Sequence, residues 1–258
     1  MEHTGVTPPG ETSGSRIKIT LPGSSKDPIR NRVLTDPING RDVMIKKLDL
    51  KKQFKHLYQP SPKKIEVLTI PPLQFAMIDG AIEKGSEPGK SPMFAEATQA
   101  LYGLAYTLKF MLKKRETDAV DYPVMPLEGL WWVEDGKFEV AVKDNWHYTL
   151  MIMQPEVITK DLFEEARELV RKKKGESGAL ARLRLASLEE GLCVQVLHVG
   201  PYADEPATVD RMREFMQQSG LRDLVGPPGK HHEIYMNDPR RTVAAKLKTV
   251  LRHPVAKI

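Results

Sequence analysis

Hydrophobic positions follow two different periods along the chain, and together they predict a mixture of helices and strands. Apolar residues recur at helical spacing after Ser91, which can cap a helix over 91–113 with Pro92 in its first turn. Two further stripes of helical period run through 159–174 and 204–218. Alternating or continuous apolar runs predict strands at 65–79, 124–133, 146–154, 192–199, 231–237 and 246–254.

The order of these elements repeats. Strand, helix, strand and strand occur in the half 64–154 and again in the half 189–255, and the helix 159–174 joins the two. Paired edge to edge, two βαββ units bury strand edges that one unit would expose. We therefore predict an α+β fold in which duplicated βαββ units form a pseudo-two-fold antiparallel sheet. The two helices of the units would cover one face, and a ligand cleft would lie at the junction, on the other face.

The start of the chain has a different composition from the rest. It is rich in Pro, Gly, Ser and Thr and has little periodic hydrophobicity, so we predict a flexible N-terminal tail over 1–41 and one domain over 42–258. Residues 49–58 follow with the pattern of a short helix that Asp49 can cap.

Composition limits the classes of partner. The 258 residues are 40% hydrophobic and 28% charged, which is typical of a globular protein. The net charge of +5 is a mild excess without a basic reading face, so we expect no nucleic-acid partner. The chain has no signal pattern and no apolar run near the ~18 residues of a membrane helix, so we expect a cytoplasmic protein without a membrane partner. The single cysteine, Cys193, is expected to pack as a small buried hydrophobe.

The stretch KHHEIYMND, residues 230–238, is the first candidate for a functional site. Successive strand residues point to opposite faces, so Glu233 and Tyr235 share a face with His231. A carboxylate and a phenol on one strand suit the binding of a cation or a polarised aromatic ligand, and they also suit general acid–base catalysis. The alternative is a solvated strand face, where glutamate is ordinarily found. A metal site needs three or four ligands, and the other histidines are scattered, so we expect neither a metal nor a cofactor.

The second candidate stretch is YPVMPLEGLWWVE, residues 122–134. Adjacent strand residues cannot share a face, so one of Trp131 and Trp132 fills the core and the other is available to a ligand. Tyr102 and Tyr106 lie one position off the apolar stripe of their helix, where they could line a cavity or simply pack.

Several strings resemble one known family. MPLEGLWW, LHVGPYADEPAT, HHEIYMNDPRRT and KLKTVLRHPV are similar to the GyrI-like (gyrase-inhibitor-like) small-molecule-binding family, and more closely to its stand-alone bacterial branch, over about 48–255. The resemblance implies a duplicated βαββ fold of the SHS2 type, with a pocket at the junction for large, flat, often cationic aromatic compounds. It implies Glu233 as the central polar group of that pocket. The aromatic residues that match the pocket by motif are Tyr235, Trp131, Trp132 and Tyr122, and Trp146, Tyr148, Tyr102 and Tyr106 are further candidates.

Three functions remain open. The first is a xenobiotic-binding protein for lipophilic, often cationic, aromatic small molecules, which a carboxylate under aromatic walls attracts. The second is a hydrolase that opens cyclopropane-containing DNA-alkylating natural products, as resemblance to some stand-alone members suggests. There Glu233 would orient or deprotonate water as general base, helped by a pKa raised through burial, and Tyr235 would polarise the substrate carbonyl. The third is a protein-binding inhibitor of the DNA gyrase type, whose surface patch is not visible in the sequence.

Overall fold

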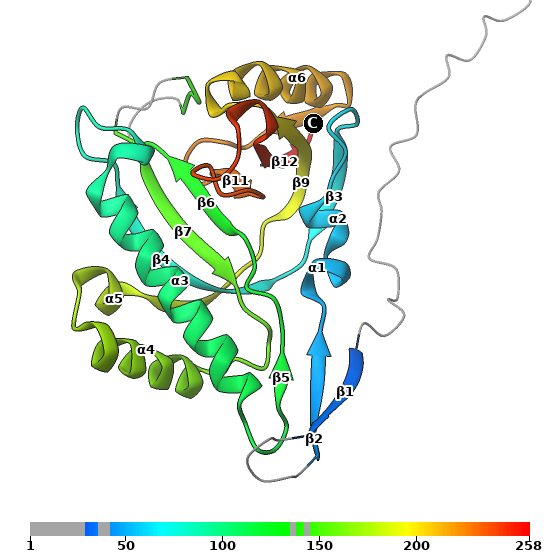
Figure 1. Cartoon of the computed structure of the whole chain (residues 1–258). Coiled ribbons are helices and arrows are strands. Elements are labelled where there is room, and N and C mark those ends of the chain that lie inside the picture. Colours follow the sequence, from blue (N-terminus) through cyan, green and yellow to red (C-terminus); the bar gives the residue numbers. More distant parts are fainter. Residues whose placement is uncertain (1–28, 36–41, 135–137, 142–144) are drawn as a thin grey trace, which may run out of the picture.

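The computed structural model describes residues 29–35, 42–134, 138–141 and 145–258. In this part of the chain a nine-stranded antiparallel sheet forms the centre of an α+β fold (Figure 1). Its strand order is β3-β9-β12-β11-β6-β7-β4-β8, and β10 pairs with β12 outside this path. The strands are β3 Glu66–Ile70, β4 Leu73–Ala81, β6 Leu127–Trp132, β7 His147–Met153, β8 Arg184–Leu188, β9 Gly191–Val199, β10 Leu221–Asp223, β11 His231–Tyr235 and β12 Lys248–Lys257.

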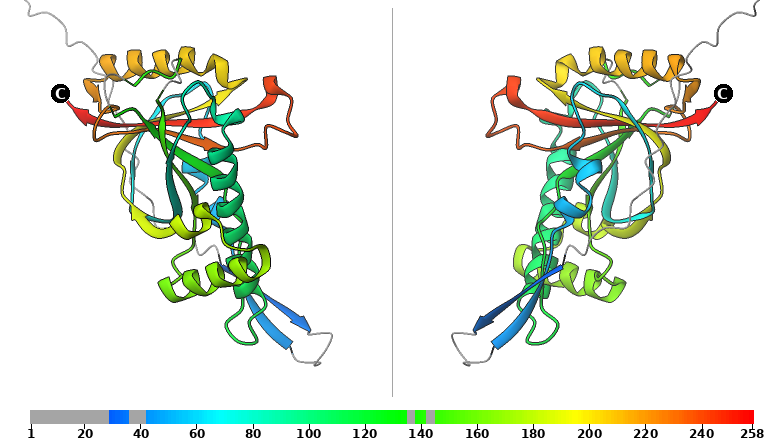
Figure 2. Two further views of the ribbon diagram at one scale, coloured as in Figure 1. Left: turned by 90° about the vertical axis from the view of Figure 1, so that its left-hand side faces the viewer. Right: turned by 90° about the vertical axis from the view of Figure 1, so that its right-hand side faces the viewer.

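A small second sheet contains β1 (Ile29–Thr35), β2 (Asp42–Leu48) and β5 (Val120–Asp121). Figure 2 shows it projecting away from the large sheet. Part of the segment that the sequence predicts as a flexible tail is therefore a strand, because β1 pairs antiparallel with β2 along its whole length. The rest of that segment, 1–28 and 36–41, lies outside the described residues.

Two helices, α3 and α1, begin where the sequence predicts their caps, whereas α4 is capped by Thr159 and not by Asp161. Ser91 Oγ accepts a hydrogen bond from the Phe94 amide at 3.0 Å and starts α3, and Asp49 accepts one from the Lys52 amide at 3.1 Å. The helices are α1 Leu50–Gln53, α2 Lys55–Tyr58, α3 Pro92–Lys113, α4 Lys160–Lys174, α5 Gly178–Arg182 and α6 Glu205–Gln218, with short 3-10 turns η1 Pro88–Lys90, η2 Tyr202–Asp204 and η3 Ala244–Lys246. None of the described helices is long and apolar enough to cross a membrane.

Helices α3 and α6 cover the same face of the large sheet. The α6 residue Thr208 contacts His198 of β9, whose ring Nδ1 lies 2.8 Å from the threonine hydroxyl. His198 pairs with Thr249, and Thr249 with Tyr235, so the three side chains share a face. Phe94 of α3 packs near this same face, and Figure 1 shows both helices against the sheet.

The opposite face is covered by the α1–α2 segment. The Tyr58 hydroxyl donates a hydrogen bond to Glu128 of β6 at 2.6 Å, and Arg252 of β12 donates one to the Leu57 carbonyl at 3.2 Å. The prediction of helices on one face therefore describes α3 and α6, whereas α1 and α2 lie on the other. The short α1–α2 segment packs there because its tyrosine finds a buried carboxylate partner.

The sequence neighbours of the two outermost strands are not their partners in the sheet. Strand β3 precedes β4 in the chain but pairs with β9, and β8 precedes β9 but pairs with β4. Cys193 of β9 is buried in this region, as predicted, and burial raises the pKa of its thiol.

Candidate functional site

A hydrogen-bonded chain of three predicted residues crosses the middle of the sheet. The Trp131 indole Nε1–H donates to the Tyr235 hydroxyl oxygen at 3.0 Å, and the Tyr235 hydroxyl donates to Glu233 Oε2 at 2.7 Å. Strand alternation puts Glu233 and Tyr235 on one face of β11. Because His231 pairs with Trp131 in the register between β11 and β6, the indole lies on that face too.

A glycine leaves the space for this arrangement. Gly129 pairs directly with Glu233, and a Cβ atom added there would lie 2.8 Å from Trp131 Nε1 and 3.3 Å from the Tyr235 hydroxyl oxygen. A larger residue at this position would therefore push apart the indole and the phenol. The sequence EGLW supplies the glycine two residues before the tryptophan, where alternation brings both to the same face.

The carboxylate at the centre of the site is buried. Glu233 is 5% exposed, so the alternative of a solvated strand face does not apply. A buried carboxylate needs hydrogen-bond donors, and Tyr235 supplies one. Burial and the charge of Glu233 raise the pKa of Tyr235 well above 10.0. The phenol therefore stays protonated and can donate a hydrogen bond.

Aromatic rings surround the two ends of the chain. Trp146 and Tyr148, both predicted, lie with ring centroids 5.1 Å and 5.8 Å from that of Trp131. Phe94 of α3 stacks on Trp131 with ring centroids 5.8 Å apart, and Tyr202 of η2 meets Tyr235 edge-on at 6.0 Å. Sequence reasoning missed the last two, although Phe94 belongs to the apolar stripe of its helix and Tyr202 to the string LHVGPYADEPAT.

Tyr202 is electrostatically linked to the carboxylate. Burial, together with the charge of Glu233, raises the pKa of Tyr202 to about 12. Tyr102 lies nearer the edge of the site, beside Leu127, which pairs with Tyr235, and burial raises its pKa as well.

Three predicted aromatic residues lie elsewhere. Trp132 points to the opposite face, where Lys230 Nζ is 3.4 Å from its ring centroid, as strand alternation requires once Trp131 faces Glu233. Tyr106 is 49% exposed on the outer side of α3. Tyr122 is buried, and its hydroxyl donates to Gln154 at 3.4 Å.

The cleft was predicted on the face without the long helices. Glu233, Tyr235 and Trp131 instead lie on the face that carries α3 and α6, because Phe94 and Tyr202 meet them there. Phe94 lies in the first turn of α3, and Tyr202 is the first residue of η2. The position of these two elements relative to the sheet is set by tertiary packing.

A second chain of hydrogen-bonded side chains begins at the other carboxylate oxygen of Glu233, Oε1. His231 Nε2 lies 3.1 Å from Glu233 Oε1, and His231 Nδ1 lies 2.7 Å from His253 Nε2. His253 Nδ1 in turn lies 2.9 Å from Asp223 Oδ2. Strand alternation predicted that His231 lies on this face. His253 of β12 and Asp223 of β10 were not predicted, because no local pattern in the sequence marks them as part of the site.

A separate buried network occupies the opposite face. Glu128 accepts from Tyr58, and its Oε2 lies 3.0 Å from His232 Nε2. His232 Nδ1 lies 2.9 Å from Glu190 Oε1, and Arg252 donates to Glu190 Oε2 at 2.8 Å. This network joins α2, β6, β11 and β12, so its evident role is to hold the α1–α2 segment on the sheet.

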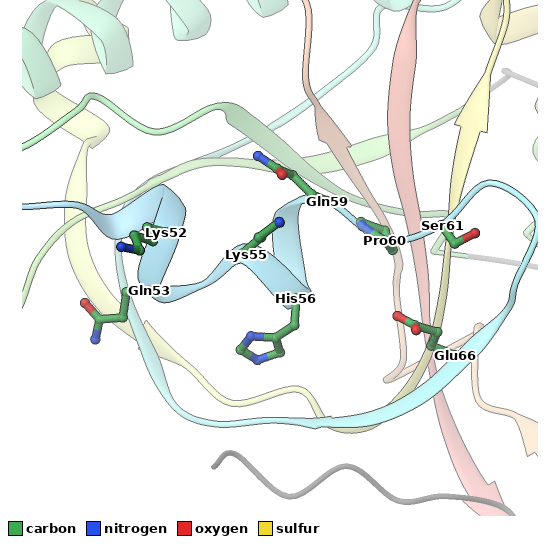
Figure 3. A pocket seen from close by; sticks show the side chains of 8 residues that line it. All are labelled: Lys52, Gln53, Lys55, His56, Gln59, Pro60, Ser61 and Glu66. Carbon is green, nitrogen blue, oxygen red and sulfur yellow. The ribbon is translucent and has the colours of Figure 1, made fainter. Parts of the chain in front are cut away.

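A surface hollow lies on the α1–α2 side, beside β3 (Figure 3). Polar and charged side chains predominate around it, and its lining residues are Lys52, Gln53, Lys55, His56, Gln59, Pro60, Ser61 and Glu66. Because it is formed by α1, α2 and β3, it is distinct from the Glu233 site. Among the residues that the structure describes, no group of three or more His, Cys, Asp or Glu side chains is arranged to hold a metal ion.

The large antiparallel sheet thus carries a buried carboxylate, Glu233, among aromatic rings on the face of α3 and α6. The chain belongs to the GyrI-like family: the family described as GyrI-like small molecule binding domain matches residues 63–256. No curated protein matches the chain.

Solved structures from Listeria innocua are similar to it. One, described as an uncharacterized conserved protein, is 43% identical over 81% of this chain and 99% of that chain, with a TM-score of 0.73. A second, described as a hydrolase, is 38% identical over 81% and 99%, with a TM-score of 0.68. A third, a hydrolase encoded by lin2189, is 39% identical over 81% and 100%, with a TM-score of 0.69.

Proposed function

We propose that the protein binds flat, lipophilic aromatic small molecules beside Glu233, Tyr235 and Trp131 and hydrolyses members of that class that carry an electrophilic cyclopropane. The observation that carries the proposal is the buried Glu233 carboxylate with the Tyr235 phenol donating to it at 2.7 Å. Acid–base hydrolysis needs a base and a hydrogen-bond donor close together. The similarity to two Listeria innocua proteins described as hydrolases supports the same conclusion.

The reaction would use both groups. Glu233 takes a proton from a water molecule, and the water oxygen forms a bond to the methylene carbon of the cyclopropane. The ring carbon–carbon bond breaks, and its electron pair moves through the conjugated system to the carbonyl oxygen. Once Glu233 has taken up the proton, the single hydroxyl proton of Tyr235, held as a neutral phenol, can turn from the carboxylate and donate a hydrogen bond to that oxygen as negative charge develops on it. The oxygen then takes up a proton from solvent, so the product is the substrate plus one water.

A second candidate uses the same site without chemistry. In it the protein binds lipophilic aromatic cations, and the carboxylate and the ring faces attract them together. The rings of Trp131, Tyr235 and Tyr202 near Glu233 favour it. The two candidates differ only in whether a bound electrophile and a water molecule reach the carboxylate at the same time.

We also propose that two βαββ units, 64–154 and 189–255, joined by α4 within one domain over 42–258, form the central part of the large sheet, to which β8 adds an outer strand. The strand order supports this. Toward the centre of the sheet, the strands of the first unit lie in the order β4, β7, β6, and the corresponding strands of the second unit lie in the order β9, β12, β11. The two units meet where β6 pairs with β11. The site then lies at the junction of the units.

Incubation with a duocarmycin-like cyclopropane compound, followed by mass spectrometry, tests the proposal. We expect wild-type protein to give a product heavier by one water, and Glu233→Gln to give none. Glu214→Gln is the matched control, because Glu214 is exposed on α6, and it should retain wild-type turnover. Tight binding of an aromatic cationic dye without any water-added product would favour the second candidate. Undiminished dye binding by Glu233→Gln would contradict the second candidate.

A further inference from the structure

Thr249 of β12 places a buried hydroxyl beside the Glu233 site. Thr249 pairs with Tyr235 in the register between β12 and β11, so the two side chains lie on the same face of the sheet. Thr249 is 0% exposed, and among the residues that the structure describes its Oγ1 has no hydrogen-bond partner. A buried polar atom without a partner costs free energy, and such atoms are rare in folded proteins. A ligand bound beside Tyr235 would supply the missing partner.

The histidine next to Thr249 on the sheet is already engaged. His198 pairs with Thr249 in the register between β12 and β9. Its Nε2 lies 3.2 Å from the Pro201 carbonyl oxygen, which only accepts, so Nε2 carries the proton of the neutral ring and donates it to that bond. Its Nδ1 lies 2.8 Å from Thr208 Oγ1 and therefore accepts from that hydroxyl. Neither ring nitrogen is left for the Thr249 hydroxyl.

Hydrogen-bond acceptors predominate around Thr249. Glu205 and Thr208 lie three residues apart on α6, so they point to the same side of the helix, and the contact of Thr208 with β9 shows that this side faces the sheet. Glu205 is 2% exposed. Burial and the charge of Glu233 raise the pKa of Tyr235 most, and the charge of Glu205 raises it further, so Glu205 acts on the same site. A polar group bound between Tyr235 and α6 thus meets carboxylate and hydroxyl oxygens, which favour a hydrogen-bond donor.

We propose that Thr249 and Glu205 form a subsite that binds a hydrogen-bond donor of the ligand, such as an aromatic amine or hydroxyl. The inference rests on the proposed function, because it extends the same aromatic site. The flat rings of the ligand lie beside Trp131 and Tyr235, and a donor group at one end of the ligand reaches Thr249 Oγ1. Tyr202 is partly exposed and meets Tyr235 edge-on, so the ligand enters when the Tyr202 side chain rotates away. The ligand class is thereby narrowed to flat aromatic compounds that carry an N–H or O–H group at one end.

Fluorescence titration with two matched probes tests the subsite. N-methylacridinium and its diamino derivative are flat aromatic cations with the same ring system, and only the derivative carries N–H donors. We expect the wild-type protein to bind the diamino compound more tightly. Thr249→Val should reduce this preference by about threefold to tenfold, because one hydrogen bond to the ligand is lost. Thr249→Ser keeps the hydroxyl and should keep the preference, and Thr117→Val, at an exposed position after α3, is the control that should match the wild type.

Urea unfolding without ligand separates this role from a structural one. The Thr249 hydroxyl has no partner within the described part of the fold, so Thr249→Val should keep or raise the urea midpoint. Thr208→Val loses the hydrogen bond to His198 and should lower it. A lower midpoint in Thr249→Val would show that the hydroxyl serves the fold, and it would overturn the subsite.

The titrations also distinguish failure of the subsite from failure of the proposed function. Equal wild-type affinity for the two probes, an unchanged preference in Thr249→Val, or an equal loss of affinity for both probes in that variant would overturn the subsite alone. Failure of the wild-type protein to bind either probe would contradict the proposed function, and the subsite with it.

Discussion

Glu128 and Glu233 lie on neighbouring strands and point to opposite faces of the same sheet. Glu233 pairs with Gly129 in the β11–β6 register, and Glu128 pairs with Ile234, so alternation separates the two carboxylates. Each is buried and each belongs to its own hydrogen-bonded network. Substitutions on the Glu233 face should therefore change function, and substitutions on the Glu128 face should change stability.

Removing the Tyr235 hydroxyl should reduce turnover more than binding. In Tyr235→Phe the ring remains but the donor to Glu233 and to a developing oxyanion is lost. We expect kcat for the cyclopropane substrate to fall by about 10²- to 10³-fold, with dye affinity changed little. Tyr106→Phe, at an exposed position of α3, is the control and should match the wild type. An unchanged kcat in Tyr235→Phe would contradict the assigned role of the phenol.

A side chain at position 129 should disrupt the site directly. The new methyl group of Gly129→Ala would lie 2.8 Å from Trp131 Nε1, so the indole must move away from Tyr235. We expect a loss of roughly 1–3 kcal/mol in the free energy of unfolding, measured in urea, and a lower kcat in the folded protein. Gly178→Ala is the control, because a Cβ atom there meets nothing within 4 Å. Equal effects of the two substitutions would mean that the close approach at Gly129 is unimportant.

Breaking the network on the other face should destabilise the protein without changing ligand affinity. Arg252→Met leaves Glu190 and His232 buried without their guanidinium partner. We expect a loss of about 3–5 kcal/mol in the free energy of unfolding. Arg240→Met removes an exposed ion pair with Asp238 and should have no measurable effect on the urea midpoint. Similar midpoints for the two variants would contradict this difference.

The same network should give stability a defined dependence on pH. Burial alone would lower the pKa of His232, but Glu190 and Glu128 raise it above 6.5. The histidine thus stabilises the fold fully below pH 6.5, and its contribution is lost as the pH rises through the raised pKa. Burial alone would raise the pKa of Glu190, but His232 and Arg252 hold it at about 2 instead of 4.5, so its contribution is present above pH 4.5 and is lost as the pH falls toward 2.

The network should therefore stabilise the fold most between pH 4.5 and 6.5. Urea midpoints measured across a pH series check this expectation. In His232→Gln the decline on the alkaline side should disappear, while the acid limb due to Glu190 remains. A decline of the same size in this variant would show that another group is responsible.

The sequence was sufficient for the three long helices and for most strands of the large sheet, but β1 and β10 were not predicted, and the predicted strand 65–79 is two strands, β3 and β4. Strand alternation put Glu233 and Tyr235 on one face and separated Trp131 from Trp132, and both results hold because alternation is a local property. It did not reveal Asp223, which lies on a strand of three residues without a periodic pattern. It also missed Tyr202, because the packing of η2 against Tyr235 depends on how the turn meets the sheet. It also did not predict that Glu233 lies on the face of α3 and α6 while α1 and α2 take the other face, since the contact of Tyr58 with Glu128 joins residues 70 positions apart.

The pairing of β3 with β9 and of β8 with β4 affects how the protein can fold during synthesis. Strand β3 leaves the ribosome long before β9, and β4 long before β8, yet these are the pairs that form. In a nascent chain that ends before β8, the edges of β3 and β4 that later pair with β9 and β8 have no partner. Unpaired strand edges are sites of aggregation. Translation must thus reach about residue 188 before β8 can pair with β4, and about residue 199 before β9 can pair with β3.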